Sequence, residues 1–121
     1  MGVTEMNTDK MIDVLGTPYR LVISNADKDE KLNDMDGYRD NTSRQCVVDD
    51  YSEKIGDYHR KFDLEKQMKK NIRHELTHAF LYESGLAENS DWAMREEMVD
   101  WVAMQGLKLY KARKEAGAVD E

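Results

Sequence analysis

The sequence predicts an α+β fold in which about three strands precede two long helices. Two observations predict it. Short β-branched and aromatic segments occur before residue 52, and apolar residues recur every three or four positions from residue 62 onward. A chain whose strands precede its helices is typical of a sheet packed against a helix. Its 121 residues suffice for a single domain, 1–121, with one modest core, and we expect residues 1–9 and 116–121 to fray.

The strands are predicted from local composition. Residues 11–16 (MIDVLG) and 18–24 (PYRLVIS) are apolar, β-branched or aromatic, and Gly16-Thr17-Pro18 between them signal a turn, so the two segments should form a hairpin. Residues 45–51 (QCVVDDY) predict the third strand, because they have an apolar centre. The polar residues in between allow a short helix around Asp29 to Met35, ended by Gly37, and a loop or ragged strand at 37–44.

A long helix is predicted for residues 62–84, ended by Gly85. His74 and His78 project from nearly the same direction, about 40° apart, because each residue turns a helix by about 100°. Leu81 and Tyr82 share that side, and apolar residues occupy the other, so we expect the helix to lie between two layers. The apolar positions, spaced three and four apart, are Leu64, Met68, Ile72, Leu76, Ala79 and Phe80.

A second long helix is predicted from about Asp91 to Ala116, after a loop at 85–90. Asn89 or Ser90 should be its N-cap, because their side chains can accept a hydrogen bond from the first turn. An apolar stripe of helical period supports this helix. Its members are Met94, Met98, Val102 and Leu109, joined by Val99, Trp101 and Tyr110.

The composition excludes several classes of protein. A formal net charge of −7 argues against nucleic-acid binding, because phosphate contacts need clustered lysine and arginine. No segment approaches the roughly 20 apolar residues that span a bilayer, and the N-terminal segment lacks an apolar signal core. The lone cysteine, Cys46, cannot form an internal disulfide, which suits a reducing compartment. We therefore expect a cytoplasmic protein that binds neither nucleic acid nor membrane.

Residues 74–78, HELTH, match the H-E-x-x-H motif. Histidines at positions i and i+4 of a helix converge on one metal ion, so His74 and His78 are candidate zinc ligands. Glu75 stands beside such a site, where it can deprotonate a metal-bound water as a general base. The helical period around the motif supports this interpretation, because a strand would hold these side chains apart.

A catalytic zinc ion normally has three protein ligands and one open position, so a third ligand is needed. We favour Glu96, because Asp100 lies four residues later on the same face and can hydrogen-bond the far nitrogen of a histidine ligand. Glu97 is the alternative, and both glutamates could instead be exposed acids favoured by the helix dipole. We expect His59 to be a surface residue and Cys46 to be a core residue.

HELTHAF (74–80) followed by EEMVDWVA (96–103) resembles the small zinc metallopeptidases of the ImmA/IrrE type, in particular the compact forms encoded by phages and mobile elements. The resemblance covers roughly residues 62–106, and its specific parts are HELTH and the acid-x-x-x-Asp pairing. It implies a zincin-like domain with a small sheet, an active-site helix and a C-terminal helix that bears a ligand. It also implies the gluzincin ligands His74, His78 and Glu96, with Glu75 as general base.

The resemblance implies a protein or peptide substrate, such as a transcriptional repressor, because family members are associated with cleaving regulators of that type. Two departures leave the substrate open. The family often has Glu-x-x-Ala-Asn where this chain has Glu-Glu-Met-Val-Asp at 96–100, and we find no DNA-binding helix-turn-helix in the sequence. An extended substrate should pair with an edge strand, for which 45–51 is the candidate. Tyr51, Tyr58 and Tyr82 cannot be ranked as oxyanion donors.

Two other hypotheses remain. The chain could be a non-catalytic zinc-binding module, although a purely structural site has no use for Glu75 and usually closes its fourth coordination position. It could also be an interaction protein without metal, in which HELTH is fortuitous; metal analysis of the purified protein separates this hypothesis from the others. A zinc deaminase is excluded, because the P-C-x-x-C ligand pair is absent.

Overall fold

The computed structural model describes residues 9–54 and 63–120. The fold is α+β, as the sequence predicts, and within these ranges four strands form one mixed sheet in the order β1-β2-β4-β3. The expected three strands were therefore one too few. The strands are β1 (Lys10–Val14), β2 (Thr17–Ser24), β3 (Gly37–Asp40) and β4 (Gln45–Asp49).

The predicted hairpin is confirmed as β1 and β2, which pair antiparallel. Its turn lies at Leu15 and Gly16 rather than at residues 16–18, because both residues adopt positive φ angles, 51° and 89°. Two consecutive residues of this kind form the tight turn whose twist matches that of the flanking strands. Pro18 consequently lies inside β2, in a part of the strand that pairs with β1 before the pairing with β4 begins.

The chain crosses from β2 to β4 through the short 3-10 helix η1 (Glu30–Asn33) and β3. β4 then pairs parallel with β2 and antiparallel with β3, so it lies inside the sheet. The prediction of 45–51 as an edge strand was wrong. Its apolar centre is buried, as is typical of a strand covered on both faces. η1 falls within the expected helix at 29–35, and β3 is the segment whose polar composition suggested a loop or ragged strand.

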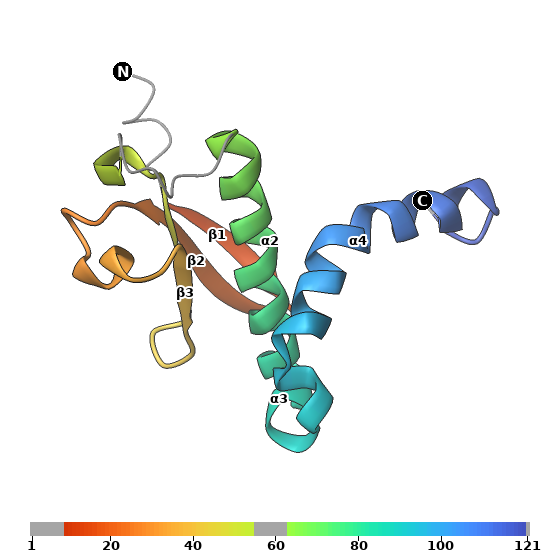
Figure 1. Cartoon of the computed structure of the whole chain (residues 1–121). Helices are drawn as coiled ribbons and strands as arrows, with labels where there is room; N and C mark the ends of the chain where they lie inside the picture. The colour runs from red at the N-terminus through yellow and green to blue at the C-terminus, as the bar shows by residue number, and fades with distance from the viewer. Residues whose placement is uncertain (1–8, 55–62, 121) are drawn as a thin grey trace.

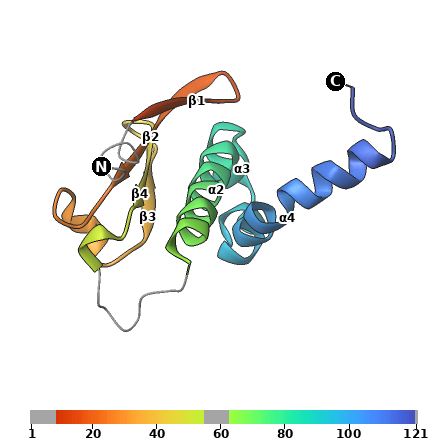
Figure 2. The same cartoon turned by 90° about the horizontal axis from the view of Figure 1, so that it is seen from above.

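The first long helix, α2 (Leu64–Glu83), begins after Asp63, whose carboxylate accepts a hydrogen bond from the backbone N–H of Lys66 at 3.2 Å. It ends before Gly85, which adopts a φ of 86°. α2 lies between the sheet and a second helix, as Figure 2 shows, so the expected position between two layers is confirmed. Its inner face packs on the core, whose buried members are Val14, Tyr19, Leu21, Ile23, Cys46, Val48, Met68 and Ala79.

The second long helix, α4, covers Glu96–Glu115 rather than 91–116. The expected loop and first turn instead contain a short helix, α3 (Leu86–Asn89), and a 3-10 helix, η3 (Asp91–Met94), followed by Arg95 in an extended conformation. Because Arg95 interrupts the helical path, Glu96 becomes the first residue of α4. Ser90 precedes η3 instead of capping α4, and its side chain makes no capping hydrogen bond among the described atoms.

The part of α4 nearest its start packs against α2, and the remainder projects away from the body of the molecule (Figure 1). Val99 and Ala103 are its buried residues. Most of the apolar stripe expected for this helix is exposed. The helix therefore does not turn its large apolar residues toward the core, as the apolar pattern alone would suggest. None of the described helices is long and apolar enough to cross a membrane.

Candidate metal centre

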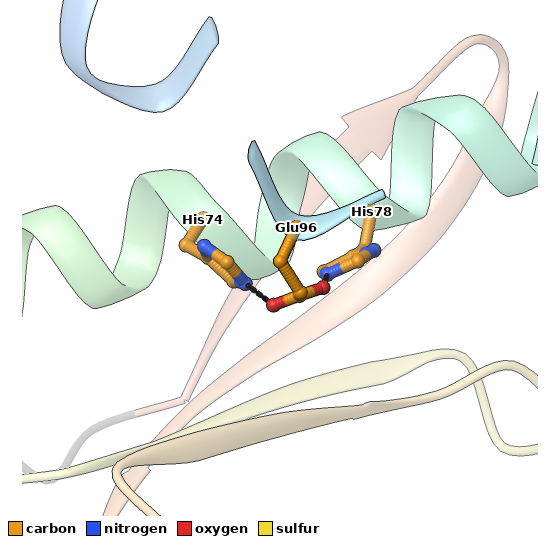
Figure 3. A group of neighbouring side chains, drawn as sticks. All are labelled: His74, His78 and Glu96. Atoms are coloured by element: carbon orange, nitrogen blue, oxygen red, sulfur yellow. Dashed lines mark ion pairs between the residues drawn. The ribbon is translucent and has the colours of Figure 1, made fainter. Parts of the chain in front are cut away.

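His74, His78 and Glu96 lie together where α2 meets the start of α4 (Figure 3). Glu96 points between the two histidines. Its Oε2 atom is 3.0 Å from Nε2 of His74, and its Oε1 atom is 2.9 Å from Nε2 of His78. The three ligand atoms lie within 4.8 Å of one another, which is close enough for one metal ion to be bound by all of them.

The close approach of α4 to α2 brings Glu96 to this position. Val99 and Ala103 are small and buried at the contact, and the distance between packed helices depends on the side chains between them. Nε of Arg73 also donates a hydrogen bond of 2.6 Å to the carbonyl oxygen of Ala103, which ties α4 to α2. The extended conformation of Arg95 then starts α4 so that its first residue faces the histidines.

Asp100 fixes the orientation of His74. Its Oδ1 atom lies 2.7 Å from Nδ1 of His74. A carboxylate only accepts hydrogen bonds, so Nδ1 carries the proton and donates to Asp100. Nε2 of His74 then faces Glu96, which is also an acceptor. That nitrogen must either carry a second proton or share a cation with Glu96.

The surroundings of His78 favour a neutral imidazole. Burial lowers the pKa of His78, and the nearby positive charge of Arg39 lowers it further, although the charge of Glu96 opposes both effects. A neutral imidazole is the form in which histidine binds a metal. Nε2 of His78 lies 2.9 Å from a carboxylate oxygen of Glu96, a contact that either a proton on Nε2 or a cation shared with Glu96 makes favourable.

Glu75 lies on the sheet side of α2, beside the histidines. It is 8 % exposed, and burial raises the pKa of its carboxyl above the usual range, although the positive charge of Arg39 and interaction with His74 act in the opposite direction. Gly37 allows β3 to approach closely, because a Cβ atom at this position would lie 3.6 Å from Cγ of Glu75 and only 2.9 Å from the carbonyl oxygen of Val47. Glu75 is therefore held between α2 and β3.

A polar cavity of about 310 Å³ opens beside the two helices and the start of β3. It gives solvent or a ligand access to Glu75 and to two of the candidate metal ligands, His74 and Glu96. Its lining residues are Asp36, Gly37, Gln67, Lys70, Asn71, His74, Glu75, Glu96 and Asp100.

The other residues considered from the sequence are distributed as follows. Glu97 contributes no atom to the metal-binding group found among the described residues. Cys46 is fully buried, as expected for a core residue, and its thiol lies 3.7 Å from the carbonyl oxygen of Glu75. Tyr51 is buried, and its hydroxyl oxygen accepts a hydrogen bond of 2.8 Å from Asn71. Tyr58 and His59 lie outside the described residues.

Sequence reasoning missed Arg39, on β3, whose charge affects both Glu75 and His78. The polar sequence at 37–44 allowed a loop or a ragged strand, and in a loop a charged residue such as Arg39 is expected to face solvent. The only available signal was that Tyr38 and Arg39 are neighbours in a possible short strand, where successive side chains point to opposite faces of the sheet. That alternation becomes informative only when β3 is known to pair with β4.

Two imidazole nitrogens and one carboxylate form a donor set that could hold a metal ion, with Glu75 and a cavity beside it. No known protein family, curated protein or solved structure matches the chain. The geometry of His74, His78 and Glu96, with its neighbours Glu75 and Asp100, is therefore the main guide to function.

Proposed function

We propose that this protein is a zinc-dependent metalloendopeptidase of the ImmA/IrrE type, with a zincin-like arrangement of its sheet and helices. The observation that carries the proposal is the position of Glu96, whose two carboxylate oxygens face Nε2 of His74 and Nε2 of His78. Two histidines and a glutamate are the ligands of one known class of catalytic zinc site, which keeps its fourth position open. Glu96 is the proposed third ligand, in preference to Glu97.

Each neighbouring residue has a role in peptide hydrolysis. Zinc held by these ligands would supply a Lewis acid that polarises the scissile carbonyl and acidifies water. Glu75 accepts a proton from the attacking water and passes it to the leaving amine, a role that suits a buried carboxyl whose pKa is raised. Asp100 accepts the hydrogen bond from Nδ1 of His74, which keeps Nε2 available as a ligand.

The substrate segment should pair with β3 rather than with 45–51. Among the described strands β3 forms one edge of the sheet, and its other side is paired with β4. Its first residue, Gly37, lies against Glu75. An extended peptide that adds to this edge by backbone hydrogen bonds passes the proposed general base, and a regulatory protein with an exposed extended segment would fit.

The test is to purify the protein, measure bound zinc, and compare wild type with Glu75→Gln on a peptide library and on candidate repressors from neighbouring genes. We expect Glu75→Gln to retain zinc and to lose cleavage, because the amide cannot accept the proton. Glu65→Gln is the matched control: it is the same substitution on the same helix, at an exposed position. It should cleave like wild type.

Three outcomes would contradict the proposal. Purified protein without a stoichiometric metal would show that the three side chains do not form a metal site. A zinc-loaded wild type that cleaves no member of the library and no candidate regulator would support a non-catalytic metal module. Equal cleavage by wild type and Glu75→Gln would mean that Glu75 is not the base.

A further inference from the structure

The exposed side of α4 carries a row of large apolar residues, the outer stripe, defined as Met98, Trp101, Val102 and Leu109. Their exposed fractions lie between 37 % and 55 %. Their spacings of three, four and seven residues place them on one side of the helix. A stripe of this kind normally faces a core, yet the residues of α4 that are buried are the small Val99 and Ala103. Val102 lies at the edge of the stripe and lines an apolar cavity of about 340 Å³ with Phe80 and Leu81 of α2. Met98, Trp101 and Leu109 do not line this cavity, and each is more than one-third exposed.

The charges of α4 are divided between its two ends. The first turns contain Glu96, Glu97 and Asp100, whereas the last turns are mainly basic. Glu97 and Lys108 lie on the same flank of the outer stripe, about 20° apart around the helix, because eleven residues make about three turns. The basic residues of the last turns are Lys108, Lys111, Arg113 and Lys114.

We propose that the outer stripe is a dimer interface, on which α4 of a second copy of this chain packs antiparallel. An antiparallel pair related by a two-fold axis brings Glu97 of each copy toward Lys108 of the other. Glu96 and Asp100 face the histidines and take no part in this pairing. A parallel pair would place like charges side by side. Antiparallel helices also bring their opposed dipoles together.

The dimer leaves the metal centre accessible. Glu96 lies about 160° around the helix from Met98, on the side that faces the histidines, so a helix packed on the outer stripe does not cover it. The interface and the proposed peptidase activity are thus independent, and either can be tested without the other.

The test is sedimentation equilibrium of the full chain at increasing protein concentration. We expect a dimer for wild type and a dissociation constant about 100-fold larger for Leu109→Lys. Each of the two copies loses one buried leucine, which is worth about tenfold in affinity. Leu107→Lys is the matched control, because Leu107 is 62 % exposed but lies on the opposite side of α4. It should dimerise like wild type, and circular dichroism should show the same helix content for all three proteins.

The orientation is tested with charge reversals. Glu97→Lys and Lys108→Glu should each weaken the dimer, and the double variant should restore it, because antiparallel pairing brings these two side chains together. A double variant as weak as the single ones would overturn the antiparallel arrangement. A monomeric wild type would overturn the interface itself. If the monomer instead bound vesicles of phosphatidylcholine and phosphatidylserine, the stripe would be a membrane-binding surface, and the dimer proposal would still be wrong. Equal weakening by Leu107→Lys and Leu109→Lys would place the contact elsewhere on the molecule.

Discussion

Replacing Glu96 by alanine should weaken zinc binding far more than replacing Glu97. The oxygens of Glu96 lie 3.0 Å and 2.9 Å from the ring nitrogens of the two histidines, whereas Glu97 lies outside the metal-binding group formed by the described residues. Zinc in four-ligand structural sites releases about 10–16 kcal/mol on binding, so an equal share for one ligand is about 3 kcal/mol. That share corresponds to a dissociation constant about 100-fold larger.

The assay is competition for zinc with a chromogenic chelator of known affinity, at constant pH and salt. We expect an increase in the dissociation constant of about 100-fold for Glu96→Ala and less than about twofold for Glu97→Ala. The two variants remove the same charge from adjacent, exposed positions, so a general effect of charge on metal affinity would appear in both. Equal losses, or a larger loss for Glu97→Ala, would refute the assignment of Glu96 as the third ligand.

Three further predictions follow from other parts of the structure. Asp100→Ala should lower zinc affinity about 10- to 100-fold in the same competition assay, because Nδ1 of His74 loses its carboxylate partner. Leu15→Asn should raise the free energy of unfolding in urea by about 1 kcal/mol, since asparagine tolerates a φ of 51° and Asn-Gly is favoured in this turn. Burial, then the charge of Glu75, raises the pKa of the Cys46 thiol from 9.0 to about 12. At pH 9 iodoacetamide should therefore alkylate native Cys46 at least about 500-fold more slowly than the unfolded chain, because the thiolate is rarer and the side chain is buried. The stability from the neutral thiol should be lost between pH 9 and 12.

The elements that the sequence predicted well are those whose signals are local. The hairpin follows from two apolar segments around a glycine turn, and α2 follows from apolar spacing that ends at Gly85. The position of His74 and His78 on one side of α2 needs only the helical period. The pairing of Glu96 with Asp100 could also be seen, because a separation of four residues on one helix is a local relationship.

The order of the strands could not be predicted, because it depends on contacts between distant segments. β4 pairs with β2 across more than twenty residues of sequence, and nothing in the composition of 45–51 shows which neighbours it will have. An apolar strand fits the inside of a sheet as well as its edge. For β3 the sequence left a loop and a ragged strand as alternatives, because its residues are polar, and only its pairing with β4 decides for the strand.

The apolar pattern of α4 does not by itself show which side of the helix is buried. The helix has two apolar sides: small residues, Val99 and Ala103, on one and the large residues of the outer stripe on the other. The large side looks like the core side, because it would bury more surface. However, Glu96 can reach His74 and His78 only if α4 lies close to α2, and small side chains permit that distance where tryptophan and methionine do not. The small residues therefore allow the close helix approach that the metal centre requires. The large residues of the outer stripe form the proposed contact with a second copy of the chain.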